Sequence, residues 1–494
     1  MALILVVLTS SVPKWVKDKT KSLGVWISTN PTLSINENYR EKLEKIRSCL
    51  NCWEYRRLTL LGKIVVLKSL IASQLVYMLS PLPTNQQVLD EINNIFYKFL
   101  WDGKGDKIKR SIMISDYENG GLRMLDLNSF NKALKLSWVR KYLNENNSGK
   151  WKLLFDFQLE DYGGAEFFRG NLDRKDVSKY INVPDPFISE IVQIWTELSF
   201  EDTVKSMEHF LSLNLWYNSL IKVGKKPIYF KSWSAKGIQK VRHLMTDESK
   251  FLSFTEFKER FDIKTNFLIF YGVISSIKDL QNKVKTQPPP KGNYEPFIDV
   301  FLSVTKTNKM IYQKYVSSKQ TSPSKTQNKW LTDCQITCCN SINWKVVYKL
   351  PFSCTKISKL IIFQFKLVHR CLATNDFLNK IGIRSDDLCT FCRDERESLI
   401  HLFWSCRETH FFWKNFEDWL IKNFISLKPS SSLSSAAALG LKANFFSNTK
   451  QYFYFLVARY YIWTCRTRET NPKIEGFPSF LSTFNPSEII PKAP

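Results

Sequence analysis

The feature that most restricts the fold of this chain is a group of three cysteines and one histidine within 18 positions. Cys389 and Cys392 are separated by two residues, and such a turn lets both thiolates reach one tetrahedral zinc ion at about 2.3 Å. His401 and Cys406 follow and can complete the shell from the other side. Four filled positions leave no place for an activated water, so the spacing predicts a structural zinc site. Four buried residues without metal are the alternative, because free cysteine is among the most buried residue types.

Apolar residues recur at helical spacing over the first 145 residues. Residues 36–57 carry them at steps of four and three, which predicts an amphipathic helix with a basic outer face. Residues 60–79 predict a helix that is apolar on most sides, and residues 127–143 predict another. Thr84, with Gln87 three residues later, predicts a capping box at the start of a further helix. We therefore expect a mainly α fold.

The helix expected at residues 60–79 raises the question of a membrane span. Lys63 and Lys68 interrupt it, and a span would place both charges in hydrocarbon. A buried helix is the better interpretation, so no membrane partner is expected.

The chain is strongly basic. Its 494 residues include 71 Lys and Arg against 46 Asp and Glu, which gives a formal net charge of +25. This surplus favours a polyanion as partner, because each neutralised phosphate releases condensed counterions. We expect RNA and/or single-stranded DNA as the partner; an anionic membrane surface is the second polyanion that this charge would suit, and it is not the expected one. Eleven cysteines are too few for a disulfide scaffold, so we expect an intracellular location, in the nucleus and/or the cytoplasm.

Three basic clusters are candidate nucleic-acid contacts, at residues 14–21, 104–110 and 222–231. Aromatic residues accompany the first and the last, and such stretches can hold phosphates with the charges while the rings stack on bases. For any single cluster, a solvated face is at least as good an interpretation. The candidate residues are Lys14, Trp15, Lys17, Lys19, Lys21, Lys104, Lys107, Lys109, Arg110, Lys222, Lys225 and Lys226.

Two low-complexity stretches indicate a domain boundary. Residues 283–296 contain three consecutive prolines, and residues 317–328 are rich in Ser, Thr, Lys and Gln. We interpret residues 283–328 as a linker. A domain at 329–470 then contains the Cys/His group, and a proline-rich tail follows at 471–494.

Several short motifs occur in a definite order along the chain. They are Lys21-Ser22-Leu23-Gly24-Val25-Trp26-Ile27, Leu61-Gly62-Lys63, Pro81-Leu82-Pro83, Phe99-Leu100-Trp101, Gly120-Gly121-Leu122, Leu215-Trp216-Tyr217 and Phe365-Lys366-Leu367-Val368-His369, followed by the Cys/His group. This succession resembles the C-terminal part of the reverse transcriptase of non-LTR (LINE-type) retrotransposons. It covers nearly the whole chain.

The resemblance implies a helical thumb-like domain at 14–145, a mainly helical connector at 146–282 and, after the linker, a small helical zinc-binding reverse-transcriptase domain at 329–470. It implies a fragment that binds RNA or DNA and uses zinc as a structural cofactor. The alternative is a host-adopted scaffold with a structural zinc site that binds protein partners through its helices.

Members of the family that this chain resembles are RNA-directed DNA polymerases. Their catalytic palm, with a Tyr/Phe-x-Asp-Asp hairpin, would precede residue 14, so we expect a truncated element or a partial gene that is inactive alone. Asp386 and Asp387 are adjacent, but they lie in a short stretch beside the Cys/His group. Solvated charge is their expected role, because two-metal catalysis needs carboxylates on a rigid scaffold.

Overall fold

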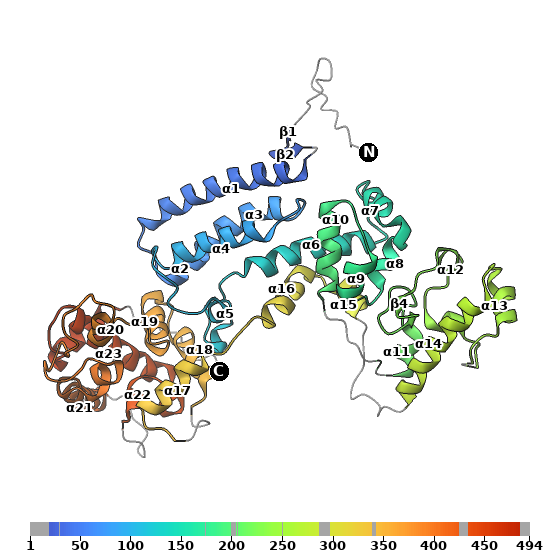
Figure 1. Ribbon diagram of the computed structural model, residues 1–494. Coiled ribbons are helices and arrows are strands. Elements are labelled where there is room, and N and C mark those ends of the chain that lie inside the picture. Colours follow the sequence, from blue (N-terminus) through green and yellow to red (C-terminus); the bar gives the residue numbers. More distant parts are fainter. Residues whose placement is uncertain are drawn as a thin grey trace. The chain divides into compact units, whose positions relative to one another are not determined.

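The computed structural model describes residues 19–28, 30–172, 174–198, 204, 206–248, 250–285, 297–337, 342–423 and 433–484. Within these residues the chain is mainly helical, and its strands form two short antiparallel hairpins (Figure 1). This confirms the predicted mainly α fold class.

The chain divides into two compact units, each assembled from three stretches of sequence. The first unit comprises Met1–Glu44, Ser73–Glu91 and Leu127–Tyr315, and the second comprises Lys45–Ala72, Ile92–Asp126 and Val316–Pro494. The division into five parts that we expect from composition and resemblance remains a prediction.

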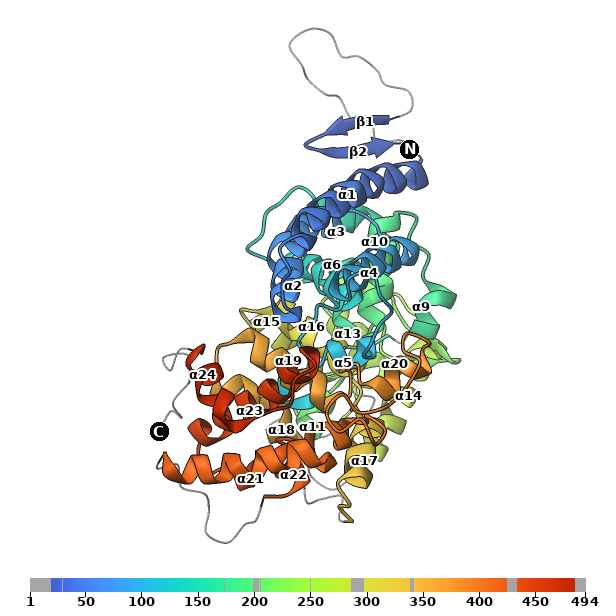
Figure 2. The same cartoon turned by 90° about the vertical axis from the view of Figure 1, so that its left-hand side faces the viewer.

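The first unit begins with a tight hairpin. Strand β1 (Lys19–Ser22) pairs antiparallel with β2 (Val25–Ser28), as Figure 2 shows. The two turn residues, Leu23 and Gly24, have φ angles of 49° and 81°. Positive φ at both positions is the geometry of a type I′ turn, which matches the twist of the flanking strands and suits a glycine.

Helix α1 (Pro31–Glu54) has the apolar stripe that the sequence predicts. Tyr39, Leu43, Ile46 and Leu50 are all buried. The side chain of Asn30 accepts hydrogen bonds from two backbone N–H groups of the first turn, and so caps the helix.

The helices of the first unit enclose an aromatic-rich core, in which Trp195, Trp216 and Trp233 are fully buried. The other elements with residues in this unit are α3 (Ala72–Leu79), α4 (Gln86–Leu100), α6 (Leu127–Leu143), α7 (Lys152–Leu159), η3 (Glu160–Tyr162), α8 (Ala165–Arg169), α9 (Arg174–Tyr180), α10 (Pro186–Thr196), α11 (Met207–Ser212), β3 (Lys222–Val223), β4 (Lys226–Pro227), α12 (Lys231–Ala235), η4 (Val241–Leu244), α13 (Phe254–Phe261), α14 (Phe267–Lys285), α15 (Phe297–Ser303) and α16 (Thr307–Ser317).

The second unit contains the Cys/His group. Figure 1 and Figure 2 both show its last helices gathered into one body, whose core includes Trp413, Phe416 and Phe455. Its elements are α2 (Leu60–Val66), η1 (Leu67–Ile71), α5 (Arg110–Met113), η2 (Tyr117–Asn119), α17 (Ser324–Asp333), α18 (Trp344–Cys354), α19 (Ser358–Val368), α20 (Asn375–Lys380), η6 (His401–Ser405), α21 (Arg407–Lys422), α22 (Ser435–Ala438), η7 (Ala443–Phe445), α23 (Thr449–Thr467), η8 (Ile474–Gly476) and α24 (Phe477–Ser482).

A buried histidine ties α19 to a glycine turn within this unit. Nε2 of His369 lies 2.8 Å from the backbone oxygen of Gly120, and burial lowers the pKa of His369 to about 4. The ring is therefore neutral at pH 7 and donates this hydrogen bond. A side chain at Gly121 would meet the backbone oxygen of Ser115 at 2.0 Å, so the close approach requires glycine.

Two local features differ from the sequence predictions. Thr84 does not form the capping box, because its backbone N–H and hydroxyl both bind the carboxylate of Glu190, and Asn85 accepts a hydrogen bond from Val88 N–H instead. The predicted linker, residues 283–328, contains α15, α16 and the start of α17. A few apolar residues such as Phe301 and Ile311, both fully buried, anchor helices that the overall composition of the segment conceals.

The helical stretch Leu60–Leu79 is the one in the described part of the chain that is long and apolar enough to cross a membrane by length and composition. In the structure, 44% of the most apolar 18-residue segment of this stretch is buried. Lys63 within it is also buried, and its ammonium group donates to the backbone oxygen of Phe99 and pairs with Asp102.

Candidate metal centre

The first two ligands lie on a tight turn before η6. The backbone N–H of Cys389 donates to the oxygen of Glu395 at 2.7 Å, and the N–H of Arg393 donates back to the oxygen of Cys389 at 3.0 Å. Arg393 has a φ of 59°, which reverses the chain directly after Cys392. The turn therefore presents the Cys389 and Cys392 side chains together.

The other two ligands lie at the two ends of a single wide helical turn. Cys406 N–H donates to the oxygen of His401 at 2.8 Å, which is the i to i+5 hydrogen bond of a π-helix. Cys406 then has extended backbone angles and precedes α21. This turn is a local feature of the kind often found at functional sites.

The four side chains converge as a zinc site requires. Their ligand atoms all lie within 4.8 Å of one another. Sγ of Cys389 lies 3.9 Å from Sγ of Cys406, and Sγ of Cys392 lies 3.4 Å from Nε2 of His401. On a tetrahedral zinc ion with Zn–S bonds of about 2.3 Å, two sulfurs are about 3.8 Å apart, and a sulfur and a nitrogen are about 3.5 Å apart. These two distances thus match a tetrahedral shell, and the remaining pairs, at no more than 4.8 Å, need to close by about 1 Å at most.

The surroundings of the four ligands are apolar. All four are buried, and Phe391, Leu399, Leu402 and Phe403 are buried beside them in sequence and belong to the same core. A buried group of thiols and one imidazole is the soft donor set that zinc favours. Zinc bound here would be fully enclosed by protein ligands, which is the arrangement of a structural site.

The hydrogen bonds of the cluster raise the pKa of Cys389 and of His401, so metal binding must release their protons. They lower the pKa of Cys406: the hydrogen bond with Cys389 is the largest cause, and His401 lowers it further against the opposite effect of burial. Such a thiolate is ready to bind a cation. The second ring nitrogen of His401, Nδ1, lies 3.1 Å from a carboxylate oxygen of Glu395. A carboxylate in this position orients a metal-binding histidine.

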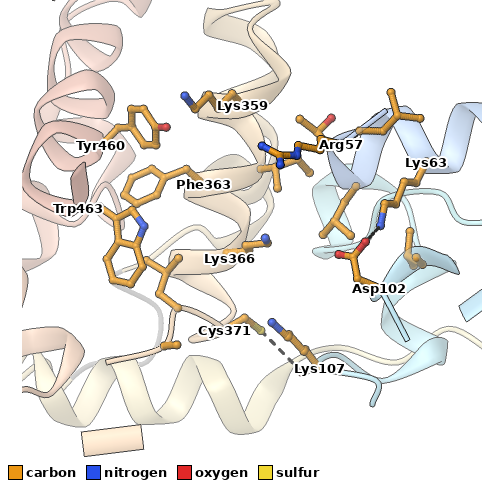
Figure 3. Close-up of a pocket in the computed structure, with 17 residues that line it drawn as sticks. Arg57, Lys63, Asp102, Lys107, Lys359, Phe363, Lys366, Cys371, Tyr460 and Trp463 are labelled. Atoms are coloured by element: carbon orange, nitrogen blue, oxygen red, sulfur yellow. Dashed lines mark hydrogen bonds and ion pairs between the residues drawn. The ribbon is translucent and has the colours of Figure 1, made fainter. Parts of the chain in front are cut away.

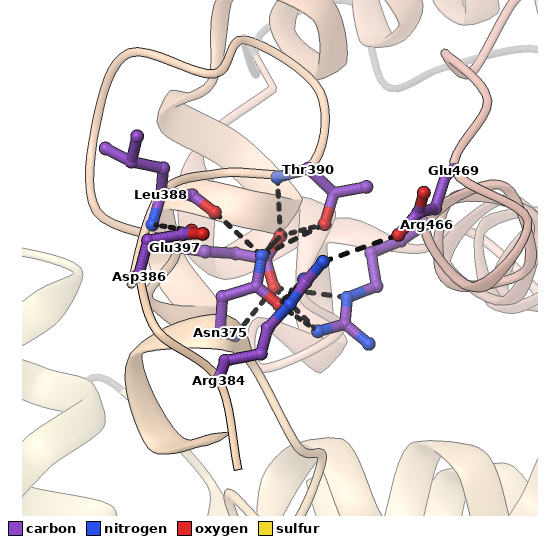
Figure 4. A network of polar contacts seen from close by, with 8 residues as sticks. All are labelled: Asn375, Arg384, Asp386, Leu388, Thr390, Glu397, Arg466 and Glu469. Atoms are coloured by element: carbon purple, nitrogen blue, oxygen red, sulfur yellow. Dashed lines mark hydrogen bonds and ion pairs between the residues drawn. The ribbon is translucent and has the colours of Figure 1, made fainter. Parts of the chain in front are cut away.

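A buried polar network fastens the metal-binding turn to α23 (Figure 4). Glu397 is fully buried and accepts hydrogen bonds from the backbone N–H groups of Asn375 and Thr390, both at 2.8 Å. Arg466 on α23 pairs with Glu397 at 2.9 Å and donates to the side-chain oxygen of Asn375 at 2.7 Å. Arg384 joins at the edge of the network through the same Asn375 oxygen. Charge pairing and hydrogen bonds together satisfy this buried carboxylate.

The basic residues predicted near the N-terminus are only partly described. Lys14, Trp15 and Lys17 lie outside the described residues. Lys19 pairs with Glu37 at 3.1 Å, and Lys21 pairs with Glu41 at 2.7 Å. Both ammonium groups also lie over the ring of Trp26. The charges of these two lysines are therefore largely compensated.

The predicted cluster at 104–110 belongs to the second unit. Lys104, Lys107 and Lys109 are exposed, and none of them forms an ion pair with a residue that the structure describes. Arg110 instead pairs with Asp106 at 2.8 Å and lies over the ring of Tyr97.

The predicted cluster at 222–231 belongs to the first unit, on the β3–β4 hairpin. Lys222 pairs with Asp176 at 2.6 Å, whereas Lys225 and Lys226 are exposed. Tyr229 stacks on Tyr217 with ring centroids 5.4 Å apart. This contact occupies a face of the ring that would otherwise be open to a base.

Asp386 and Asp387 have local partners. Asp386 accepts a hydrogen bond from the backbone N–H of Leu388 at 3.1 Å, and Asp387 pairs with Arg396 at 3.4 Å. They behave as loop residues that support the metal-binding turn.

Sequence reasoning missed Glu395 and the buried pair of Glu397 and Arg466. Glu395 could have been noticed because it lies between the cysteine pair and the histidine, where a carboxylate can reach the ring. The buried pair joins residues 69 positions apart and has no local signal.

Comparisons with known proteins agree with this site. Residues 307–413 match the family described as zinc-binding in reverse transcriptase. A segment of the chain is 28% identical over 125 residues to a protein of Arabidopsis thaliana named as a ribonuclease H protein, and covers 24% of this chain and 20% of that protein. Another alignment, 26% identical over 139 residues, is to an uncharacterized 149 kDa protein of the transposon TX1 of Xenopus laevis, with 28% of this chain and 10% of that protein covered.

The matched family and the ligand geometry confirm the predicted zinc cofactor. The family match covers about a fifth of the chain, and the two aligned segments cover 20% and 10% of the two relatives. Residues 307–413 are therefore similar to the zinc-binding domain of reverse transcriptases, with Cys389, Cys392, His401 and Cys406 as the zinc site, and short segments of the chain are similar to a transposon protein and a protein named as a ribonuclease H.

Proposed function

We propose that this protein binds RNA or single-stranded DNA, as the part of a LINE-type reverse transcriptase that follows the catalytic palm. The observation that carries the proposal is a complete Cys₃His site inside a domain of the reverse-transcriptase zinc-binding family, in a chain of net charge +25. In this role the zinc site shapes the domain, and exposed basic side chains elsewhere on the chain hold phosphates. The cysteines of the described part are all free, which supports a location inside the cell, in the nucleus or the cytoplasm.

The exposed lysines support this proposal. Lys104 and Lys109 in the second unit, and Lys225 and Lys226 in the first, have no partner that would compensate their charge among the described residues. Solvated, uncompensated lysines attract a phosphate backbone without any need to break an ion pair.

The test is the salt dependence of binding by the full zinc-loaded chain to unstructured RNA and DNA strands. Several phosphate contacts predict that raising salt from about 50 to 200 mM lowers the affinity by orders of magnitude. K104Q/K109Q and K225Q/K226Q should each weaken binding more than the control K345Q/K349Q, which removes two exposed charges from α18. Affinity that does not change with salt would contradict the proposal.

A protein-interaction scaffold is the second candidate function. The first turns of α14 expose Phe267, Leu268 and Tyr271, with 52%, 72% and 58% of their surface accessible. Neighbouring exposed apolar side chains of this size suit a protein partner. If this function is the right one, binding of the partner should vary little with salt, and L268E should abolish it without affecting nucleic-acid affinity.

A further inference from the structure

A cavity in the second unit collects basic side chains from distant parts of the sequence. It has a volume of about 410 Å³, within the ~300–1,000 Å³ typical of sites for small ligands. Lys359 and Lys366 project into it from α19 (Figure 3). Lys63 comes from α2, Arg57 from the residues just before α2, and Lys107 from the stretch between α4 and α5. Helix α19 packs against α2, which brings these groups together.

The charges around this cavity are unbalanced. Asp102 is the one acidic residue among those that line it, and it pairs with Lys63. Within the described chain, Arg57, Lys107, Lys359 and Lys366 form no ion pair. Arg57, Lys107 and Lys359 are exposed at the rim, whereas Lys366 is half-buried. Four cations that face one space repel one another, and an anion in that space would relieve the repulsion.

The cost of this arrangement is visible at Lys366. Burial and then the positive charge of Lys107 lower the pKa of Lys366 below that of an ordinary lysine. The charged form of Lys366 is therefore less stable here than it would be in water, and a phosphate beside the ammonium group would stabilise it again. A solvated surface lysine would carry no such cost.

The opposite wall of the cavity is aromatic. Phe363, Tyr460 and Trp463 line it, with the Phe363 and Tyr460 rings 5.2 Å apart at their centroids. Lys359 lies 5.2 Å from the centre of the Tyr460 ring, where the cationic and aromatic sides meet. A wall of rings beside a group of cations matches a nucleotide, which has an apolar, flat base and a charged phosphate.

We propose that this cavity seats one unpaired nucleotide of a single strand. Its phosphate lies among Arg57, Lys107, Lys359 and Lys366, and its nucleoside lies against Phe363, Tyr460 and Trp463. A base within a duplex has both faces stacked and cannot enter such a concave site, so the site selects single-stranded segments. This inference rests on the proposed nucleic-acid binding and assigns one site to it.

The test compares four forms of the full zinc-loaded chain for binding to a short labelled polyuridine strand. They are the wild type, K359Q/K366Q, the charge-preserving K359R/K366R and the control K345Q/K349Q, whose lysines are exposed on α18 and do not line the cavity. Weaker neutralisation of this one phosphate should lower the salt slope by at most about 0.7 and the affinity roughly tenfold or more. The arginine variant should bind nearly as the wild type does, and zinc content serves as the check of folding.

A competition experiment tests the aromatic wall. Uridine monophosphate should displace the strand from the wild type at lower concentration than inorganic phosphate does, and W463L should reduce this difference. If K359Q/K366Q weakens binding no more than K345Q/K349Q, the cavity proposal is wrong while nucleic-acid binding stands. If inorganic phosphate competes as well as the nucleotide, the cavity is a site for a simple anion and the proposal is wrong. If the wild type binds no strand, the proposed function itself fails.

Discussion

The carboxylate of Glu395 lies 3.1 Å from Nδ1 of His401, while Nε2 of the same ring lies 3.4 Å from Sγ of Cys392. The two ring nitrogens thus face different groups, since Nε2 faces the cysteine sulfurs and Nδ1 lies within ion-pair distance of a carboxylate. A carboxylate beside Nδ1 favours the tautomer that carries its proton there, which leaves Nε2 to bind a metal and increases its basicity.

Substitution of Glu395 tests this relationship. Glu395→Gln should lower zinc affinity by about 10-fold, at the lower end of the 10- to 100-fold range for such partners, because the Glu395 side chain is 70% exposed. Competition with a coloured chelator measures the affinity. Asp394→Asn removes a neighbouring exposed charge and should leave the affinity unchanged. If both substitutions lower the zinc affinity equally, Glu395 acts only through its negative charge and not by orienting His401.

The buried pair of Glu397 and Arg466 should stabilise the domain around the zinc site. Glu397→Gln leaves Arg466 without a counter-charge, and removing one partner of a buried pair costs about 3–5 kcal/mol. We expect faster hydrogen exchange in α20 and α23, measured by mass spectrometry. Arg468→Gln, at an exposed position two residues further on, is the control. An exchange rate for Glu397→Gln that equals the rate of this control would show that the pair contributes little.

Removal of a ligand should affect the second unit selectively. Cys392→Ser should release zinc and loosen residues 365–413, because the energy of metal binding is folding energy in such a site. Helices α1 and α6 should keep their protection against hydrogen exchange. Cys465→Ser changes another buried cysteine outside the zinc group and should retain stoichiometric zinc. If Cys392→Ser unfolds the whole chain, the metal has a wider role than this structure supports.

The basic cavity should make nucleic-acid binding dependent on pH. The pKa of Lys366 is lowered by burial and by Lys107, so its charge is lost at a lower pH than that of an ordinary lysine, near 10.4. Affinity should therefore fall as pH rises from neutral toward that value. The neighbouring Cys371 thiol, whose pKa burial raises to about 11, stays neutral over this range.

Lys366→Arg provides the control for this pH dependence. Arginine keeps its charge throughout the range, so the affinity of the variant should fall less than that of the wild type between neutral and alkaline pH. The same fall of affinity in Lys366→Arg and in the wild type would assign the titration to another group.

The zinc ligands could be predicted because their chemistry is local. Cys389, Cys392, His401 and Cys406 lie within 18 positions, and their residue types and spacing are enough to indicate a metal. The helices α1 and α6 were predictable for a similar reason, since the periodic pattern of apolar residues lies within each segment. Nothing in that pattern indicated the π-helical turn that starts at His401.

The features that sequence did not reveal depend on tertiary contacts. Thr84 lost its predicted capping role to Glu190, which lies 106 positions away. The basic cavity joins Arg57 and Lys107 to α19, and no local pattern connects these segments. One signal was available, since Lys359 and Lys366 are seven positions apart in an otherwise apolar helix and so share a face.

X-ray absorption at the zinc edge, on the full chain purified with zinc and dialysed, tests the central claim most directly. The structure predicts one zinc per chain, with three sulfur ligands at about 2.3 Å and one nitrogen at about 2.0 Å. Substoichiometric zinc, or a shell made mainly of oxygen and nitrogen ligands, would contradict the assignment of Cys389, Cys392, His401 and Cys406 as the metal site.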